Sequence, residues 1–219
     1  MLTEAVQDYL KTIWKLQQDG RATTSAIAES LDVSAASATA MLKRLSALGL
    51  VEHERYRGAV LTPAGEQIAL EIVRHHRLLE LYLMQALGLG WDEVHVEADR
   101  LEHALSEELE AKIDQELGYP THDPHGDPIP DRDLRVQPAR ATSLAELEPG
   151  RRATVSQVPD GDPALLRYLA ELGLVPGRTV ELVALAPFSG PITVRTEHGE
   201  HAISRELALS INGVPLRPS

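Results

Sequence analysis

The sequence predicts a mainly helical chain that ends in a small β-rich domain. Apolar residues recur at intervals of three and four across residues 3–117, and four prolines then interrupt the pattern between residues 118 and 134. Short alternating segments fill the chain after residue 142. The length of 219 residues exceeds one typical domain. We therefore expect three domains, at residues 1–70, 71–140 and 141–219.

The first domain contains a helix-turn-helix pattern. An amphipathic helix is expected over residues 3–18, and TTSAIAESLDVSAASATAMLKRLSALGL comes soon after it. Thr23 or Thr24 can cap a short helix, and Ser34 can cap a second helix that runs to about Leu48. Two helices joined by so tight a turn are typical of DNA-binding proteins.

Two short strands, at residues 50–53 and 59–62, follow the second helix and predict a hairpin, or wing. The second helix suits a major groove, and the arginines of the ERYRG tip suit phosphates or a minor groove. The small Ala36 permits close approach of the helix to DNA. The alternative is a solvated surface without a partner. The candidate DNA-binding residues are Ser34, Ala36, Ser37, Thr39, Lys43, Arg55 and Arg57.

The net charge of −12 is unevenly distributed along the chain. Residues 1–70 carry seven basic and eight acidic residues, whereas residues 71–142 carry seven and sixteen, and residues 143–219 carry seven and nine. The first domain is therefore nearly neutral and can present a local basic face to DNA. We expect a palindromic double-stranded operator as the partner.

Two long helices are expected over residues 63–88 and 91–117, without a sheet to cover them. They fit a homodimer interface, and an intramolecular bundle is the alternative. Within them, the stretch HVEADRLEH places Asp99, Glu102 and His103 on one helical face, with His95 one turn earlier. The chain has no cysteine, so oxygen and imidazole nitrogen must hold any metal ion. From these residues alone, a metal-ligand set and a solvated face both stay open.

Several classes of function lack support in the sequence. There is no phosphate-binding loop, dinucleotide fingerprint, zinc-protease motif or serine-hydrolase elbow, so we do not expect an enzyme, although a metal-dependent hydrolase stays an alternative. No apolar run has the length of a membrane span, and the N-terminus lacks the pattern of a secretory signal. We expect a cytoplasmic protein.

The order of motifs resembles the diphtheria toxin repressor family of metal-dependent regulators. The resemblance rests on the winged helix-turn-helix, RHHRLLE, VHVEADRLEH, PHGDPIP, and finally LAELGLVPGRTVEL with AISRELALSI. It covers essentially the whole chain and implies a helical dimerisation and metal-binding domain and a C-terminal SH3-like β-barrel, related to a domain of ferrous-iron transport accessory proteins.

The resemblance also implies two sets of metal ligands. The primary set is Asp8, Asp99, Glu102 and His103, and the ancillary set is His76, Glu80 and His95. Some family members add ligands from the barrel, which here fall on Asp160 and Asp162, where a turn before a helix is the alternative.

Two positions bear on the choice of metal. Iron-type members have Met and Cys where this chain has Asp8 and Asp99, and hard oxygen ligands suit Mn(II). Fe(II) accepts the same ligands and stays an alternative. Lys11 stands where manganese members often have Glu, which favours separate sites over a binuclear one.

The resemblance therefore implies a Mn(II)-responsive transcriptional repressor that controls metal homeostasis and acts as a homodimer. Without the ion, we expect the clustered carboxylates to repel one another and leave the DNA-binding domain loosely held. A metal buffer whose helix-turn-helix serves only packing, and a DNA-binding protein indifferent to metal, are the rival hypotheses.

Overall fold

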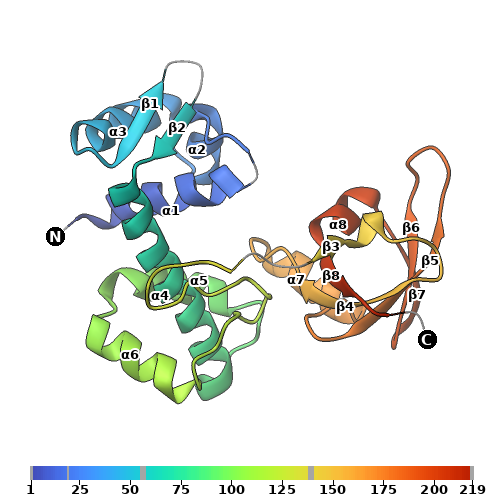
Figure 1. Cartoon of the computed structure of the whole chain (residues 1–219). Coiled ribbons are helices and arrows are strands. Elements are labelled where there is room, and N and C mark those ends of the chain that lie inside the picture. The colour runs from blue at the N-terminus through green and yellow to red at the C-terminus, as the bar shows by residue number, and fades with distance from the viewer. Residues whose placement is uncertain (1, 19, 55–57, 138–140, 218–219) are drawn as a thin grey trace. The chain divides into compact units, whose positions relative to one another are not determined.

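We describe the chain from a computed structural model that covers residues 2–18, 20–54, 58–137 and 141–217. By its internal contacts the chain divides into two units. The first unit contains residues 1–76, 101–107 and 130–135, and the second contains residues 77–100, 108–129 and 136–219. Helix α4 (Pro63–Leu87) contributes to both units (Figure 1).

The first unit is built on α1 (Glu4–Gln18), which buries one apolar stripe. The side chains of Val6, Leu10 and Ile13 recur at intervals of three and four and are at most 1% exposed. Helix α1 contacts α2 (Thr24–Ser30), which in turn contacts α3 (Ala35–Ala47), and these two helices bury Ile27, Leu42 and Leu45 completely. The predicted amphipathic helix is confirmed.

Both predicted caps of the helix-turn-helix are present. Thr23 Oγ1 accepts a hydrogen bond from the backbone N–H of Ala26 at 3.1 Å, and Ser34 Oγ accepts one from Ser37 at 3.1 Å. Between the two helices, Asp32 has a φ of 50°, which makes the turn sharp. These caps satisfy N–H groups that a helix start otherwise leaves without partners, and they fix where each helix begins.

The predicted hairpin follows α3. Strands β1 (Val51–Glu54) and β2 (Gly58–Leu61) pair antiparallel, with Val51 opposite Leu61. A bond from Ala59 N to Ala22 O at 2.8 Å ties β2 to the segment before α2. The tip, with the candidate residues Arg55 and Arg57, lies outside the described residues.

One predicted element is wrong. The sequence pattern indicates a continuous helix over residues 91–117, whereas the structure has α5 (Val94–Leu101), a 3₁₀ turn η1 (Glu102–Ala104) and α6 (Glu107–Glu116). The backbone becomes extended at Leu105, with φ −70° and ψ 123°, and this ends the first segment. An unbroken apolar period does not reveal such a break, because the helices on both sides keep the same period.

The C-terminal part of the second unit is a six-stranded antiparallel sheet in the order β3-β8-β4-β5-β6-β7. Its strands are β3 (Thr142–Ser143), β4 (Arg152–Gln157), β5 (Thr179–Leu185), β6 (Ile192–Thr196), β7 (Gly199–Ile203) and β8 (Asn212–Pro215). The turn η2 (Leu144–Glu146) and helices α7 (Pro163–Glu171) and α8 (Arg205–Ser210) accompany them. Leu166, Leu182 and Ile192 lie in one buried core formed by the sheet and its helices.

The predicted fold class, mainly helical with a small β domain at the C-terminus, is confirmed. Thr196 pairs with Gly199, so Glu197 and His198 form a two-residue hairpin turn between β6 and β7. Among the described residues, no helix combines the length and the apolar character required to cross a membrane.

Candidate metal centre

The break after α5 shapes the first cluster of candidate ligands. Residues 101–107 belong to the first unit, together with α1, and η1 carries Glu102 and His103. The side chain of His75 on α4 contacts the backbone oxygen of Glu102, with 3.1 Å from Nδ1 to the oxygen. Because both groups are buried, this contact holds the turn against α4.

Three candidate ligands meet in the first unit. His103 Nε2 lies 2.9 Å from Asp8 Oδ1 on α1 and 3.6 Å from Glu102 Oε1. One ligand atom from each of the three residues lies within 4.8 Å of the others. A divalent ion holds its ligands about 2.0–2.6 Å away, so ligand atoms of one ion lie about 3–5 Å apart. The three residues therefore fit one ion, and we call them the first-unit cluster.

A lysine occupies the other side of the Glu102 carboxylate. Lys11 Nζ lies 2.6 Å from Glu102 Oε2 and 3.0 Å from His76 Nδ1. His76 Nδ1 is itself 2.6 Å from the same Glu102 oxygen. Glu102 is only 1% exposed, so its charge is balanced here within the protein. The expected repulsion between metal-free carboxylates is thus reduced by a cation that the chain itself supplies.

The charge state of the two carboxylates follows from these neighbours. Burial alone would raise the pKa of Glu102, but the hydrogen bond with His76 and the charges of Lys11 and His76 outweigh it and lower that pKa. Burial raises the pKa of Asp8, although the adjacent His103 counters part of the effect. The Glu102 carboxylate is therefore held in its charged form, in which it can bind a cation, whereas Asp8 is the easier of the two to protonate.

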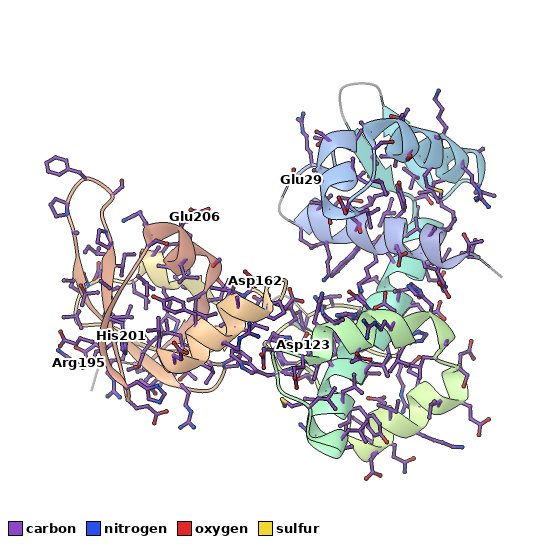
Figure 2. All side chains as sticks on the ribbon, turned by 180° about the vertical axis from the view of Figure 1, so that it is seen from behind. Glu29, Asp123, Asp162, Arg195, His201 and Glu206 are labelled. Carbon is purple, nitrogen blue, oxygen red and sulfur yellow. The ribbon has the colours of Figure 1, made fainter. Side chains whose placement is uncertain are left out.

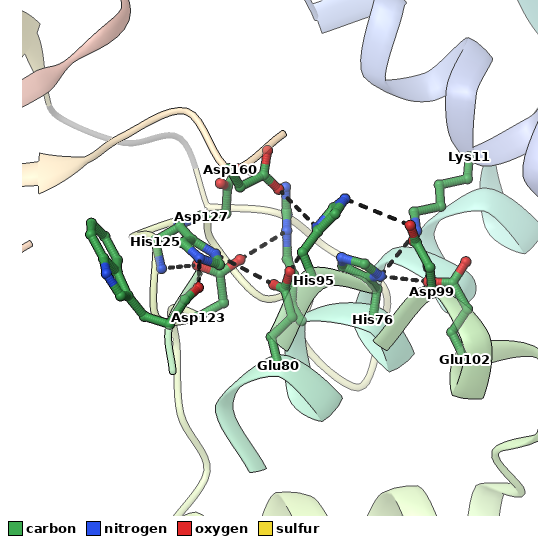
Figure 3. A network of polar contacts seen from close by, with 12 residues as sticks. Lys11, His76, Glu80, His95, Asp99, Glu102, Asp123, His125, Asp127 and Asp160 are labelled. Carbon is green, nitrogen blue, oxygen red and sulfur yellow. Dashed lines mark hydrogen bonds and ion pairs between the residues drawn. The ribbon is translucent and has the colours of Figure 1, made fainter. Parts of the chain in front are cut away.

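The second unit gathers another set of candidate ligands. His95 Nδ1 on α5 lies 2.9 Å from Glu80 Oε1 on α4 and 3.7 Å from Asp160 Oδ2, in the loop after β4 (Figure 3). Asp99 also lies in this unit, with its Oδ2 3.6 Å from His95 Nε2. His76 precedes Glu80 by one turn of α4.

Two further residues beside Glu80 were missed from the sequence. His125 Nδ1 lies 3.8 Å from Glu80 Oε2, and Glu80, Asp123 and His125 each place one ligand atom within 4.8 Å of the others (Figure 3). His125 is completely buried, and among the described residues neither its Nδ1 nor Asp123 Oδ2 has a hydrogen-bond partner, although Arg77 Nε lies 3.7 Å from Asp123 Oδ2. Buried polar atoms without hydrogen bonds are rare, and an ion is one explanation of them. We call Glu80, Asp123 and His125 the buried triad.

The loop that carries the buried triad is held on several sides. His125 Nε2 contacts the Trp91 carbonyl oxygen at 2.8 Å, which leaves Nδ1 facing Glu80. Arg77 on α4 donates to Asp127 Oδ1 at 2.9 Å. A Cβ on Gly126 would lie 1.8 Å from the Ser156 oxygen of β4, and its φ is +90°. Only glycine permits this close approach between loop and sheet.

The carboxylates around His125 change its charge state. Burial would lower the pKa of His125, but Glu80 and Asp123 more than offset it and raise the pKa to about 9. Burial, with the charges of Asp127 and Glu80, raises the pKa of Asp123 well above its ordinary value. Without a metal ion, the triad therefore retains protons to balance its negative charge.

The sequence contained one signal for the triad. Two histidines and two aspartates lie between prolines in THDPHGDP, but the prolines indicated only that the helical pattern is interrupted there. Asp162, in contrast, has a local role, because its Oδ1 accepts a hydrogen bond from Ala164 N at 2.8 Å and caps α7 (Figure 2).

The structure places most candidate DNA-binding residues of α3 at its surface. Ser34, Ala36, Ser37 and Lys43 are exposed, and Thr39 is half-buried. Ser34 Oγ and Ser37 Oγ lie 2.9 Å apart, and Thr39 Oγ1 donates to Ala35 O at 2.7 Å. These hydroxyl groups thus already make local hydrogen bonds. Among the described candidates, Lys43 is the one whose side chain carries a positive charge that can pair with a phosphate.

Comparisons with known proteins agree with this arrangement. The family model for the N-terminal DNA-binding domain of iron-dependent repressors matches residues 1–59, and the model for their metal-binding and dimerisation domain matches residues 62–131. The FeoA domain matches residues 142–214. Iron-dependent repressor IdeR of Mycobacterium tuberculosis is 33% identical over 223 residues, which cover 96% of each chain.

Two solved structures are similar over nearly the same length. A manganese-dependent transcriptional repressor in complex with manganese is 40% identical, with a TM-score of 0.89, and the match covers 96% of this chain and 100% of that one. The manganese regulator SloR is 30% identical, with a TM-score of 0.81, over 96% of this chain and 98% of that one. The domain matches, the identities and the shared fold agree, and the chain therefore belongs to the diphtheria toxin repressor family of metal-dependent repressors.

Proposed function

We propose that this chain is a transcriptional repressor that binds operator DNA as a homodimer when Mn(II) occupies the first-unit cluster. The observation that carries the proposal is the meeting of Asp8 with Glu102 and His103. Asp8 lies on α1, which packs with the helix-turn-helix, whereas Glu102 and His103 lie on η1, at the end of the metal-binding helices.

The residues present suit a hard divalent ion. The cluster offers two carboxylates and one imidazole without sulfur, a donor set that favours Mn(II) and also accepts Fe(II). When bound, the ion supplies positive charge that offsets Asp8 and Glu102. Those two side chains and His103 then hold α1 and η1 together, so that α3 is presented in a fixed orientation.

This arrangement implies how operator binding depends on the ligands. In a homodimer the two α3 helices would enter successive major grooves about 34 Å apart on a palindromic operator. Lys43 and the arginines of the wing would contact phosphates, and Ser37 would lie near base edges. Metal and operator must then strengthen one another's binding by the same factor. The buried triad, with His95 and Asp160, is proposed as a second ion site that steadies the other unit.

The test is operator binding with and without metal. A fluorescent promoter fragment from the neighbourhood of the chain's own gene is titrated with the full chain at fixed salt, under chelator, Mn(II) or anaerobic Fe(II). Glu102→Gln and His103→Ala should abolish the metal effect, while Glu29→Gln, an exposed acid on α2, should keep it. Tight binding indifferent to metal and to these variants would contradict the proposal.

The same titration separates the alternatives. Activation by Fe(II) at lower concentration than Mn(II) would assign the regulator to iron. Binding of metal without any DNA binding would favour a metal buffer. We propose that the chain is not an enzyme, and metal-dependent hydrolysis lost in His103→Ala without any change in DNA binding would contradict that.

A further inference from the structure

The two ring nitrogens of His103 face different neighbours. Nε2 points to the carboxylates of the first-unit cluster, 2.9 Å from Asp8 Oδ1 and 3.6 Å from Glu102 Oε1. Nδ1 points away from them and lies 2.9 Å from Gln7 Oε1. The His103 side chain is 10% exposed, so water has little access to either nitrogen.

Metal binding requires one particular tautomer of this ring. A neutral imidazole carries its proton on one nitrogen and a lone pair on the other, and only the lone pair binds a metal ion. The Gln7 amide oxygen is an acceptor, so the contact requires a proton on Nδ1. With Nδ1 holding its proton, Nε2 is the nitrogen that can give a lone pair to an ion, in place of the hydrogen bond that it makes with Asp8 when no ion is bound.

The same helix supplies both the ligand and this hydrogen-bond acceptor. Gln7 and Asp8 are consecutive residues of α1, and each contacts one nitrogen of His103. The ring therefore cannot rotate without losing a contact to α1. The buried triad follows the same principle with the nitrogens exchanged, since His125 Nε2 contacts the Trp91 carbonyl and Nδ1 faces the carboxylates.

We propose that Gln7 is a positioning residue of the metal site, which fixes the tautomer and the orientation of His103 so that Nε2 is the metal ligand. The inference rests on the proposed function, because it assumes that His103 binds an ion. A group that accepts a hydrogen bond from the second ring nitrogen of a metal-binding histidine raises the affinity for the metal about 10–100-fold.

The experiment compares four full-length proteins labelled with ¹⁵N at histidine. Gln7→Leu keeps a similar size without an acceptor, and Gln7→Glu keeps an acceptor. Gln18→Leu is the matched control, because Gln18 lies on the same helix, where its side-chain amide donates to the Trp14 carbonyl oxygen at 3.3 Å. Each protein is titrated with ¹¹³Cd(II) as a diamagnetic probe, and the coupling of cadmium to each His103 nitrogen is recorded. Mn(II) affinity is measured in parallel.

The wild type and Gln18→Leu should show coupling through Nε2 alone. Gln7→Leu should bind about 10–100-fold more weakly, with the specific Nε2 coupling weakened or divided between the nitrogens, and Gln7→Glu should restore both readouts. Equal affinity and unchanged Nε2 coupling in Gln7→Leu would overturn the role of Gln7. Absence of His103 coupling in the wild type would overturn the proposed metal site instead. If Gln7→Leu loses its helical circular dichroism, Gln7→Ala decides by the same two readouts.

Discussion

Lys11 offers a quantitative test of how the first-unit cluster is held without metal. Its ammonium forms an ion pair of 2.6 Å with Glu102, and the two side chains are 9% and 1% exposed. Breaking such a buried pair costs about 3–5 kcal/mol, and one hydrogen bond to a charged group contributes about 1.5–3 kcal/mol. Because His76 still contacts the same Glu102 oxygen, we expect Lys11→Met to lower the free energy of unfolding by about 2–3 kcal/mol.

The assay is thermal and urea unfolding in chelator, followed by the fluorescence of Trp14 in a Trp91→Phe background. For a chain of this size each kcal/mol shifts the melting temperature by about 2–4 °C, so Lys11→Met should melt about 4–12 °C lower. Lys43→Met is the control, since Lys43 is exposed on α3 and should change stability by less than about 0.5 kcal/mol.

A double-variant cycle identifies the partner. Lys11→Met combined with Glu102→Gln should cost less than the sum of the single changes, with a coupling energy of about 1.5–3 kcal/mol. Mn(II) should stabilise the Lys11→Met variant more than the wild type, because Glu102 has then lost the ammonium group that offsets its charge. A loss within about 0.5 kcal/mol of the Lys43→Met control, or strict additivity in the cycle, would refute the reasoning.

Three further results are expected. In chelator, the unfolding free energy should fall as the pH rises from about 6.5 to about 9. The reason is that the folded-state pKa of His125 lies above its unfolded value, so its bound proton stabilises the folded chain below that pH range. Urea unfolding at several pH values measures this slope, and His125→Gln should flatten it. Ser34→Ala should lower stability by about 1 kcal/mol through loss of the α3 cap, measured by urea unfolding, and an unchanged midpoint would contradict the cap. Lys43→Ala should reduce the slope of log affinity for the operator against log salt by about two, since a homodimer loses one phosphate contact from each subunit, and anisotropy at several salt concentrations measures it.

The local structure of the first unit could be predicted because its signals are local. Thr23 and Ser34 act within three residues of their own position, and the apolar stripe of α1 reports a helix wherever it packs. Such features require no knowledge of tertiary contacts. The two strands of the hairpin were also predicted from a local signal, namely two short apolar segments on either side of a polar one.

The site was harder to predict because it depends on contacts distant in sequence. Lys11 meets Glu102 across 91 residues, and no periodicity relates the two. The resemblance supplied Asp8, Glu102 and His103 as members of one set together with Asp99, which lies instead beside His95, and it could not indicate that Gln7 contacts the ring of His103. His125 could not be predicted as a ligand for another reason. The prolines and the glycine beside it in the sequence are typical of a surface loop, whereas the structure buries His125 completely.

The contacts of His125 also bear on what the C-terminal sheet contributes. Val158, the residue after β4, donates its backbone N–H to the His125 carbonyl oxygen at 3.0 Å, and Gln157 Nε2 donates to Asp127 Oδ1 at 3.1 Å. Gly126 lies against the Ser156 carbonyl, and Asp160 reaches His95. The sheet therefore forms one wall of the second set of ligands. Because burial of the triad depends on that wall, removal of residues 141–219 should expose His125 to water and weaken the second site, while Asp8, Glu102 and His103 keep their own contacts within the first unit.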